Sequence, residues 1–432
     1  MVRGALFVGA VAAALTTGCK RDDSEPVRQL DREGDAALVV IVDRAASGVT
    51  LVDEEEPNDD VESAQLLSLP GGVRGHLDGE IDVDHYRIAI DEPSQLKAIV
   101  TGADDADLIL DVLDEEGELI VRSDRAPAGT SEGVPNLALE PGEYIVKIHE
   151  FVRGREAGEG DRARQGMSEP YELVVELAQP EPGYEQEPNE DIETASELEL
   201  DRDALGYLGW HRDVDVWRVS LAGLLDTDGL DIVLQGVPWV TPKLELLSPS
   251  GEVLLERSGR RGEGIAMHNV APHHALAEKA DRDALYVRVS GGRSNPEEPY
   301  RLRVTRRDLD PESELEPNHE PALATPLRDE PDELEGQRAG HLDLGDVDTY
   351  RLGTSPGQRT LFATVEPSSG VRATLQAVVD GEVVAETEAS GRGAEAMVAD
   401  VDIPAGRDAH VVVRGDSADA MGGGYRLRWS LH

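Results

Sequence analysis

One acidic motif occurs three times in this chain. The segments "EEEPNDDVESAQ", "EQEPNEDIETAS" and "ELEPNHEPALAT" begin at Glu54, Glu185 and Glu314, so successive copies lie roughly 130 residues apart. That interval is the size of a small domain. It predicts three tandem modules within the 432 residues. We call each Glu-x-Glu-Pro-Asn stretch an EPN segment.

The segments after each EPN segment follow one order. An Asp-Val-Asp pair precedes an aromatic residue, Tyr86, Trp217 or Tyr350, which is most simply interpreted as a core residue. Alternating segments such as "HYRIAI" and "VWRVSL" then predict half-buried strands, because side chains two apart share a face of a strand. The segments "LILDVLDEEGELIVRS", "KLELLSPSGEVLLERS" and "VVDGEVVAETE" each predict a hairpin. The last strand of each module begins at a tyrosine, namely Tyr171, Tyr300 or Tyr425.

Helical periodicity is nearly absent. The chain is therefore predicted to be all-β, with each module an antiparallel β-sandwich of about seven to nine short strands. The expected order is a signal peptide over 1–19, a polar tether over 20–51, and modules over 52–178, 183–306 and 312–432.

The only cysteine, Cys19, follows an apolar run with Arg3 before it. That run, "ALFVGAVAAAL", is too short to span a membrane and is typical of an export signal. With Gly18 it resembles the lipobox of bacterial lipoproteins, although Thr16 stands where that family prefers leucine. The resemblance implies lipidation of Cys19 and, with Lys20 next, an outer-membrane location. An ordinary cleaved signal with an unmodified thiol is the alternative.

The charge balance limits the partners. Lys and Arg number 41 and Asp and Glu 88, a formal net charge of −47. Such a field repels nucleic acids and favours cations and basic partners, so nucleic-acid binding is excluded as a main role. Surface solvation explains most of the acidic residues.

Taken together, the EPN segment, the Asp-Val-Asp-x-(Tyr/Trp) motif, the hairpin and the Tyr-x-Leu closing strand resemble the bacterial pre-peptidase C-terminal domain. The resemblance covers nearly all of 52–432 as three tandem copies. It implies a jelly-roll-like β-sandwich. Such domains are usually appended to secreted peptidases, and relatives in bacterial collagenases bind calcium and collagen. No peptidase domain accompanies the modules here.

The residues of the EPN segments themselves point to a cation. In an extended chain Glu54, Glu56 and Asn58 project to one side, and Pro57 restricts the backbone to an extended conformation. Oxygen donors on one face repel one another unless a cation or a basic group lies between them. Donors of this kind, without Cys or His, favour Ca²⁺, and the Asp-Val-Asp pair is placed to add further carboxylates.

The family resemblance implies one ligand set per module. In module 1 it consists of Glu54, Glu56, Asn58, Asp59, Asp82 and Asp84. In module 2 it consists of Glu185, Glu187, Asn189, Asp213 and Asp215, and in module 3 of Glu314, Glu316, Asn318, Asp346 and Asp348. Glu190 and His319 depart from Asp59, and histidine is a poor calcium ligand, so calcium is least expected in module 3. The alternative is that these residues only cap the sandwich by bonding to turn amides.

Two further features have simpler interpretations. His268, His273 and His274 form a possible transition-metal cluster, but Pro272 interrupts it and a plain surface loop is favoured. Trp210 and Trp239 lie outside the clearest strands and are expected to be buried, although either offers a stacking surface for sugar.

The sequence thus predicts no catalytic residues. It favours a non-catalytic lipoprotein, anchored in the membrane by its N-terminal lipid, whose calcium-stabilised modules form a multivalent binding or adhesion surface. The alternative is a substrate-targeting accessory of secreted hydrolases. In either case an extracellular or periplasmic protein or polysaccharide is the expected partner.

Overall fold

The computed structural model describes residues 49–78, 82–125, 128–151, 167, 169–276, 283–328, 330, 332–419 and 421–432. Cys19, the predicted signal peptide and the predicted tether up to residue 48 lie outside these residues. No helix in the described ranges is long and apolar enough to cross a membrane.

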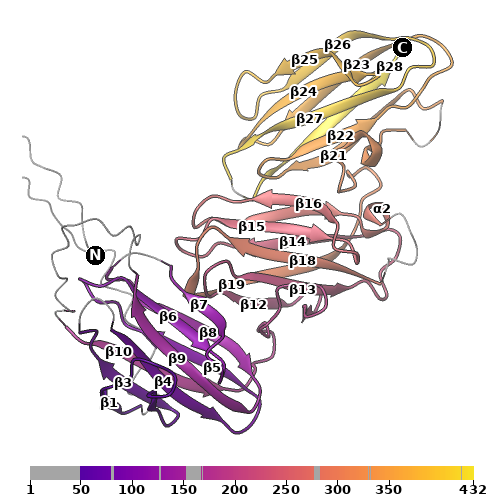
Figure 1. Cartoon of the computed structure of the whole chain (residues 1–432). Coiled ribbons are helices and arrows are strands. Elements are labelled where there is room, and N and C mark those ends of the chain that lie inside the picture. Colours follow the sequence, from indigo (N-terminus) through magenta and orange to yellow (C-terminus); the bar gives the residue numbers. More distant parts are fainter. Residues whose placement is uncertain are drawn as a thin grey trace, which may run out of the picture. The chain divides into compact units, whose positions relative to one another are not determined.

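The first module consists of two five-stranded sheets, with strand orders β1-β3-β10-β5-β8 and β2-β4-β9-β6-β7 (Figure 1). Its strands are β1 (Leu51–Asp53), β2 (Gln65–Leu66), β3 (Gly71–Gly75), β4 (Val83–Ile90), β5 (Ser94–Val100), β6 (Leu108–Leu113), β7 (Leu119–Ser123), β8 (Glu132–Leu139), β9 (Gly142–Glu150) and β10 (Tyr171–Ala178).

The second module has sheets ordered β12-β19-β14-β17 and β11-β13-β18-β15-β16. Its elements are β11 (Ser196–Leu198), β12 (Asp203–Leu208), β13 (Val214–Ser220), β14 (Asp228–Gln235), β15 (Pro242–Leu247), β16 (Val253–Ser258), β17 (Ile265–Val270), the short helix α2 (Pro272–Ala275), β18 (Ala284–Gly291) and β19 (Asn295–Asp308).

The third module has sheets ordered β21-β28-β23-β26 and β20-β22-β27-β24-β25. Its elements are the 3₁₀ turn η3 (Pro321–Leu323), β20 (Thr325–Pro326), β21 (Glu335–Leu342), β22 (Val347–Arg351), β23 (Arg359–Pro367), β24 (Val371–Val379), β25 (Glu382–Glu388), β26 (Ala396–Ile403), β27 (Ala409–Ser417) and β28 (Gly423–Leu431).

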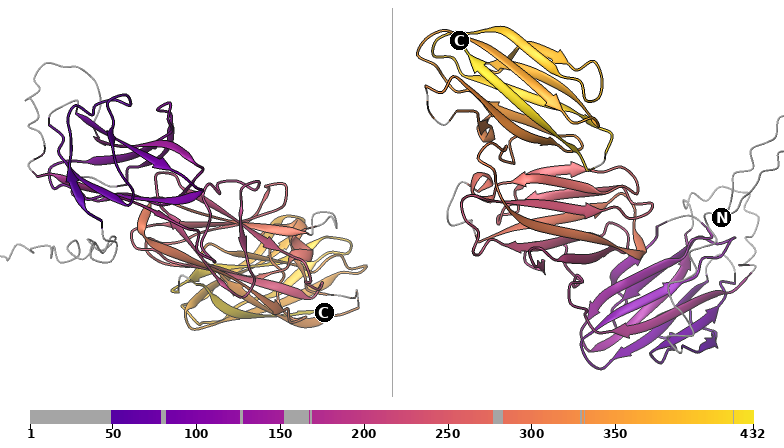
Figure 2. Two further views of the ribbon diagram at one scale, coloured as in Figure 1. Left: turned by 90° about the horizontal axis from the view of Figure 1, so that it is seen from below. Right: turned by 180° about the vertical axis from the view of Figure 1, so that it is seen from behind.

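The strand order is the same in all three modules, apart from the extra edge strand β1 in the first. The main strands pair antiparallel, and only the short strands next to the EPN segments pair parallel: β1 with β3, β2 with β4, β11 with β13, and β20 with β22. The three predicted hairpins are present as β6–β7, β15–β16 and β24–β25. The prediction of an all-β chain of sandwich modules is confirmed (Figures 1 and 2).

Each module has its own apolar core between its two sheets, built from the inward-facing side chains of both sheets. Tyr86, Trp217 and Tyr350 are fully buried in these cores, as predicted. Trp210, from the segment before β13, is buried with the core of the first module. Trp239 is different, because 54% of its surface is exposed, contrary to the expected burial.

Candidate metal centres

The first glutamate of each EPN segment accepts a hydrogen bond from the backbone at the C-terminal end of β3, β12 or β21. The three bonds are His76 N–H to Glu54 (2.9 Å), Tyr207 N–H to Glu185 (2.6 Å) and His341 N–H to Glu314 (2.8 Å). One carboxylate oxygen of each residue is therefore used to fix the EPN segment to the sheet, which is the capping role that the sequence left open.

A tyrosine of the closing strand contributes to each centre; it is the first residue of β10 but lies inside β19 and β28, which begin at Asn295 and Gly423. Tyr171 donates to Asp84, Tyr300 to Glu185 (3.3 Å) and Tyr425 to Asp348 (2.5 Å). The buried aromatic after the Asp-Val-Asp pair contacts the same hydroxyl, at 2.6 Å in Tyr86–Tyr171, 2.7 Å in Trp217–Tyr300 and 2.5 Å in Tyr350–Tyr425. The sequence predicted these aromatics in the core but did not reveal their contacts with the tyrosine hydroxyls.

A glycine makes room for each tyrosine hydroxyl. A Cβ atom on Gly75, Gly206 or Gly340 would lie 2.3 Å from that oxygen, which is too close for any side chain. The signal was present in the sequence as a glycine at the same place in each repeat, in "RGH", "LGY" and "AGH".

The second glutamate of each EPN segment meets the Asp-Val-Asp pair. In each module, carboxylate oxygens of three residues lie within 4.8 Å of one another: Glu56, Asp82 and Asp84; Glu185, Glu187 and Asp215; Glu316, Asp346 and Asp348. We call these groups, with the remaining acids of the EPN segment and the Asp-Val-Asp pair beside them, centres 1, 2 and 3. The structure thus brings together most of the acids that the sequence assigned to each module.

The backbone of the EPN segments differs from the expected extended conformation. The bonds Glu56–Pro57, Glu187–Pro188 and Glu316–Pro317 are cis, and the glutamate before each proline turns back to accept the N–H of the asparagine that follows. Asp59, Glu190 and His319, which come after that asparagine, are exposed and belong to none of the three groups. The expected ligand role of Asp59 therefore finds no support in its position.

Centre 2 is buried and holds several oxygens without partners. Within the described residues, Glu187 Oε1, Asp213 Oδ1 and both carboxylate oxygens of Asp215 have no hydrogen-bond partner of normal geometry, although the Tyr300 hydroxyl interacts with Asp215. Asn189 is also fully buried, and neither of its side-chain polar atoms has a hydrogen-bond partner among the described residues. No ion pair joins these acids to a positive side chain in the part of the chain that the structure describes. A buried set of hard oxygen donors with no counter-charge fits a divalent cation such as Ca²⁺.

The electrostatics of the acids agree with this fit. Burial, followed by repulsion from Asp213 and Glu185, raises the pKa of Glu187 to about 10. Burial likewise raises the pKa of Asp84 in centre 1 to about 8, with Glu54 and Asp82 adding to the effect against the hydrogen bond from Tyr171. Carboxyls that resist ionisation in the protein alone are stabilised as anions when a cation is bound between them.

Centre 1 has the same donors in a more open setting. Glu56 is exposed, Glu54 and Asp82 are half-buried, and Asp84 is buried. Asp84 Oδ1 and both polar atoms of Asn58 are buried without partners among the described residues. Centre 1 therefore also fits a hard cation, with fewer of its donors shielded from water than in centre 2.

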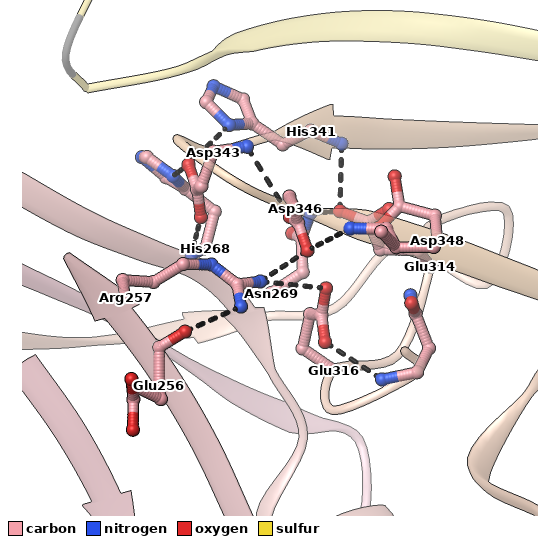
Figure 3. A network of polar contacts seen from close by, with 12 residues as sticks. Glu256, Arg257, His268, Asn269, Glu314, Glu316, His341, Asp343, Asp346 and Asp348 are labelled. Carbon is pink, nitrogen blue, oxygen red and sulfur yellow. Dashed lines mark hydrogen bonds and ion pairs between the residues drawn. The ribbon is translucent and has the colours of Figure 1, made fainter. Parts of the chain in front are cut away.

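Centre 3 differs from both because a positive side chain lies in it (Figure 3). Arg257, on β16 of the second module, pairs with Asp346 and lies 3.7 Å from Glu316. Because this positive charge already lies among them, the acids of centre 3 do not fit a metal ion in the way those of centre 2 do.

The second module also supplies polar groups around centre 3. The amide of Asn269 donates to Glu314, and His268 lies 2.8 Å from Asp343 Oδ1 (Figure 3). His341, from the third module itself, lies 2.9 Å from the same oxygen. His268 lies in strand β17, so the expected surface loop is wrong for this residue. Asp343, the acidic partner of His268 that the sequence did not reveal, belongs to the third module.

No family model matches the sequence, and no curated protein matches it significantly. Among solved structures, the chain matches the pre-peptidase C-terminal domain of a Bacillus anthracis collagenase at 17% identity and TM-score 0.21, over 28% of this chain and 100% of that one. It also matches a Clostridium perfringens ZmpB structure with CBM51-1 and CBM51-2 domains (10% identity, TM-score 0.16, 84% of this chain and 34% of that one). A third match is the VP2 subviral particle of infectious bursal disease virus (9% identity, TM-score 0.15, 79% and 71%). Scores this low do not establish a shared fold.

Proposed function

We propose that this chain is a non-catalytic binding protein with calcium-stabilised modules, held at the bacterial outer membrane by a lipid on Cys19. The observation that carries the calcium is centre 2, where buried carboxylate and amide oxygens lie together without a positive partner in the described residues. The anchor rests on the lipobox-like sequence alone. Calcium would hold the EPN segment against the Asp-Val-Asp strand and so close the end of the sandwich.

Thermal unfolding of the full chain tests the metal. After removal of metal with a chelator, adding Ca²⁺ at about 100 times its dissociation constant is expected to stabilise a binding module by about 2.7 kcal/mol. Mg²⁺ at the same concentration is expected to do much less, because it demands a small octahedral site and gives up its water reluctantly. Equal unfolding midpoints in Ca²⁺ and in chelator would remove calcium from the proposal.

A repeated surface supports multivalent binding. Each module exposes large aliphatic side chains just after the turn of the same hairpin: Leu119 and Ile120 on β7, Val253 on β16, and Val383 and Val384 on β25. Scattered exposed aliphatics are ordinary on a protein surface, but their recurrence at one position in three modules gives the chain three equivalent apolar contacts. Weak contacts of this kind add up when they lie on one chain.

Surface plasmon resonance on immobilised collagen and on immobilised peptidoglycan tests this surface. Serine at Leu119 and Ile120 is expected to weaken retention, and serine at all five positions to reduce it by a further factor of about 100, the scale of an avidity effect. Serine at Leu66, an exposed leucine outside the hairpins, is the control. Retention of the five-site variant equal to that of the unaltered chain would exclude the hairpins as the binding surface.

One observation favours the alternative of a polysaccharide-targeting accessory. Trp239 is exposed on a turn, with the Arg261 guanidinium 4.6 Å from its ring centroid, and the second face of an exposed indole is suited to stacking on a sugar ring. Affinity electrophoresis of Trp239→Ala in gels containing soluble glucans or xylans tests this role, with Phe151→Ala as an exposed aromatic control. Unchanged mobility of both variants and of the unaltered chain would leave the alternative without support.

A further inference from the structure

Arg257 is an unusual residue of the second module because it is charged and almost fully buried. Its side chain is 5% exposed, and its guanidinium lies among the acids of centre 3 rather than among those of its own module. Nη2 pairs with Asp346 Oδ1 and lies 3.7 Å from Glu316 Oε1, and Nη1 donates to the Glu256 carbonyl at 3.1 Å (Figure 3). A buried arginine is found in proteins only where acidic groups compensate its charge.

The residues that Arg257 contacts belong to the group that would otherwise hold a metal. Glu316, Asp346 and Asp348 are the three acids whose oxygens lie within 4.8 Å of one another in centre 3. A guanidinium that hydrogen-bonds Asp346 and lies 3.7 Å from Glu316 supplies the positive charge that centre 2 lacks among its described residues. A metal ion in centre 3 would have to displace it.

The position is specific to one junction. Counted from the glycine of the hairpin turn, Arg257 corresponds to Ser123 in the first module and to Thr387 in the third. The strand registers agree, since Ser123, Arg257 and Thr387 lie opposite Leu110, Leu244 and Leu375. Ser123 donates to Glu132 within its own module and brings no charge to centre 2.

We propose that Arg257 is the permanent cation of centre 3, so that the second and third modules are joined by a metal-independent ionic lock while calcium is confined to centres 1 and 2. Calcium binding was least expected in module 3 because of His319. Arg257 supplies a different reason, since His319 is exposed. The positive charge of Arg257 is retained because Asp346 and Glu316 more than offset the effect of burial on its pKa. The ion count, though not the lock, rests on the proposed calcium function.

Two measurements on the full chain test the lock. Equilibrium dialysis against Ca²⁺ is expected to give two ions per chain for the unaltered protein and three for Arg257→Gln, whose neutral side chain leaves centre 3 without its cation. Arg257→Lys retains the charge and is expected to stay at two. Arg218→Gln, which removes a surface arginine paired with Glu197, is expected to stay at two as well. Three ions in the unaltered chain, or two in Arg257→Gln, would overturn the proposal.

Hydrogen exchange in chelator tests the lock without any calcium. Strands β22 and β28 are expected to stay protected in the unaltered chain and to lose roughly a hundredfold or more of their protection in Arg257→Gln, because removing one partner leaves buried charges unpaired. Added Ca²⁺ is expected to restore it. Equal protection in both chains would refute the lock. If the unaltered chain binds no calcium but Arg257→Gln still loses protection in chelator, only the calcium function is refuted and the lock stands.

Discussion

The side-chain amide of Asn269, on strand β17, lies 2.8 Å from Glu314 Oε1 in the EPN segment of the next module. Asn136, at the same position of β8, donates to Glu185 at 2.6 Å. Backbone bridges accompany both contacts, joining Leu137 to Glu187 and Val270 to Glu316. The EPN segments of the second and third modules are therefore bonded to the preceding module as well as to their own.

Replacing Asn269 is expected to weaken this connection. Its φ is 55°, a left-handed value that asparagine and glycine adopt readily, so Asn269→Gly removes the hydrogen bond without straining the backbone. We expect the free energy of unfolding in urea to fall by about 1–3 kcal/mol, the loss for a buried acceptor left with fewer partners.

Asp400 provides the matched control. It occupies the corresponding position of β26, has φ of 55° and is exposed. Asp400→Gly should change stability by less than about 0.5 kcal/mol. Equal effects of the two glycine variants would show that Asn269 acts through its backbone alone.

A methyl group at Gly340 should disrupt centre 3 sterically. Its Cβ would lie 2.3 Å from the Tyr425 hydroxyl and 2.6 Å from Glu314 Oε2, so the closing strand must shift. Differential scanning calorimetry of Gly340→Ala is expected to show a loss of about 1–3 kcal/mol. Gly357→Ala is the control, since a Cβ there meets nothing within 4 Å. A midpoint for Gly340→Ala as high as that of the control would contradict the close packing.

Removing one acid from centre 2 should have opposite effects with and without metal. The folded-state pKa of Glu187 is raised from 4.5 to about 10, so its ionisation in the unfolded chain destabilises the metal-free fold increasingly as pH rises above 4.5. Glu187→Gln is therefore expected to raise the unfolding midpoint in chelator, more at pH 8 than at pH 5. In Ca²⁺ the same variant should lose a ligand and melt lower.

The exposed neighbour Glu190 separates this effect from a general loss of negative charge. Glu190→Gln should change both midpoints much less, because its carboxylate is in water, lies outside the cluster and adds only a screened repulsion to Glu187 and Asp213. If the two variants behave alike in chelator and in Ca²⁺, the repulsion within centre 2 is not the cause.

Acid unfolding should depend on Asp111 in the first module. Burial alone would raise the pKa of this carboxyl, but hydrogen bonds from Arg122 and His149 outweigh burial and lower it from 3.8 to about 2. A lowered pKa contributes stability that is fully present above pH 4 and is lost as pH falls towards 2. The contribution is about 2 kcal/mol at neutral pH.

Circular dichroism during acid titration measures this contribution. Asp111→Asn should be less stable than the unaltered chain at pH 7 and converge with it near pH 2. Asp203→Asn, which removes a half-buried partner of Arg301 and Arg303, is expected to have a much smaller effect, because water screens the ion pairs that lower the pKa of Asp203. A constant difference between the Asp111 variant and the unaltered chain over the whole range would contradict the assignment.

The module architecture was predictable because its signals are local. Period-two alternation fixes which side chains enter a core, and a turn between two such segments specifies a hairpin, as in β6–β7 around Gly117. The meeting of Glu56 with Asp82 and Asp84 was also predicted, although its expected basis in simple strand alternation was wrong, since the EPN segment turns at its cis proline.

The remaining features of the centres depend on partners that are distant in the sequence. Tyr171 reaches Asp84 only because β10 and β4 lie on facing sheets, and nothing near either residue signals the contact. Arg257 was harder still to foresee. It breaks the repeat instead of following it, and its partners belong to another module.

The bonds of the third EPN segment to β17 have a practical corollary for anyone cutting this chain into pieces. A fragment starting at residue 312 would carry centre 3 but leave behind both Arg257 and Asn269. Expressed alone, the last repeat would differ electrostatically from the same repeat inside the intact molecule, and under the proposed role of Arg257 its acids would be open to a cation.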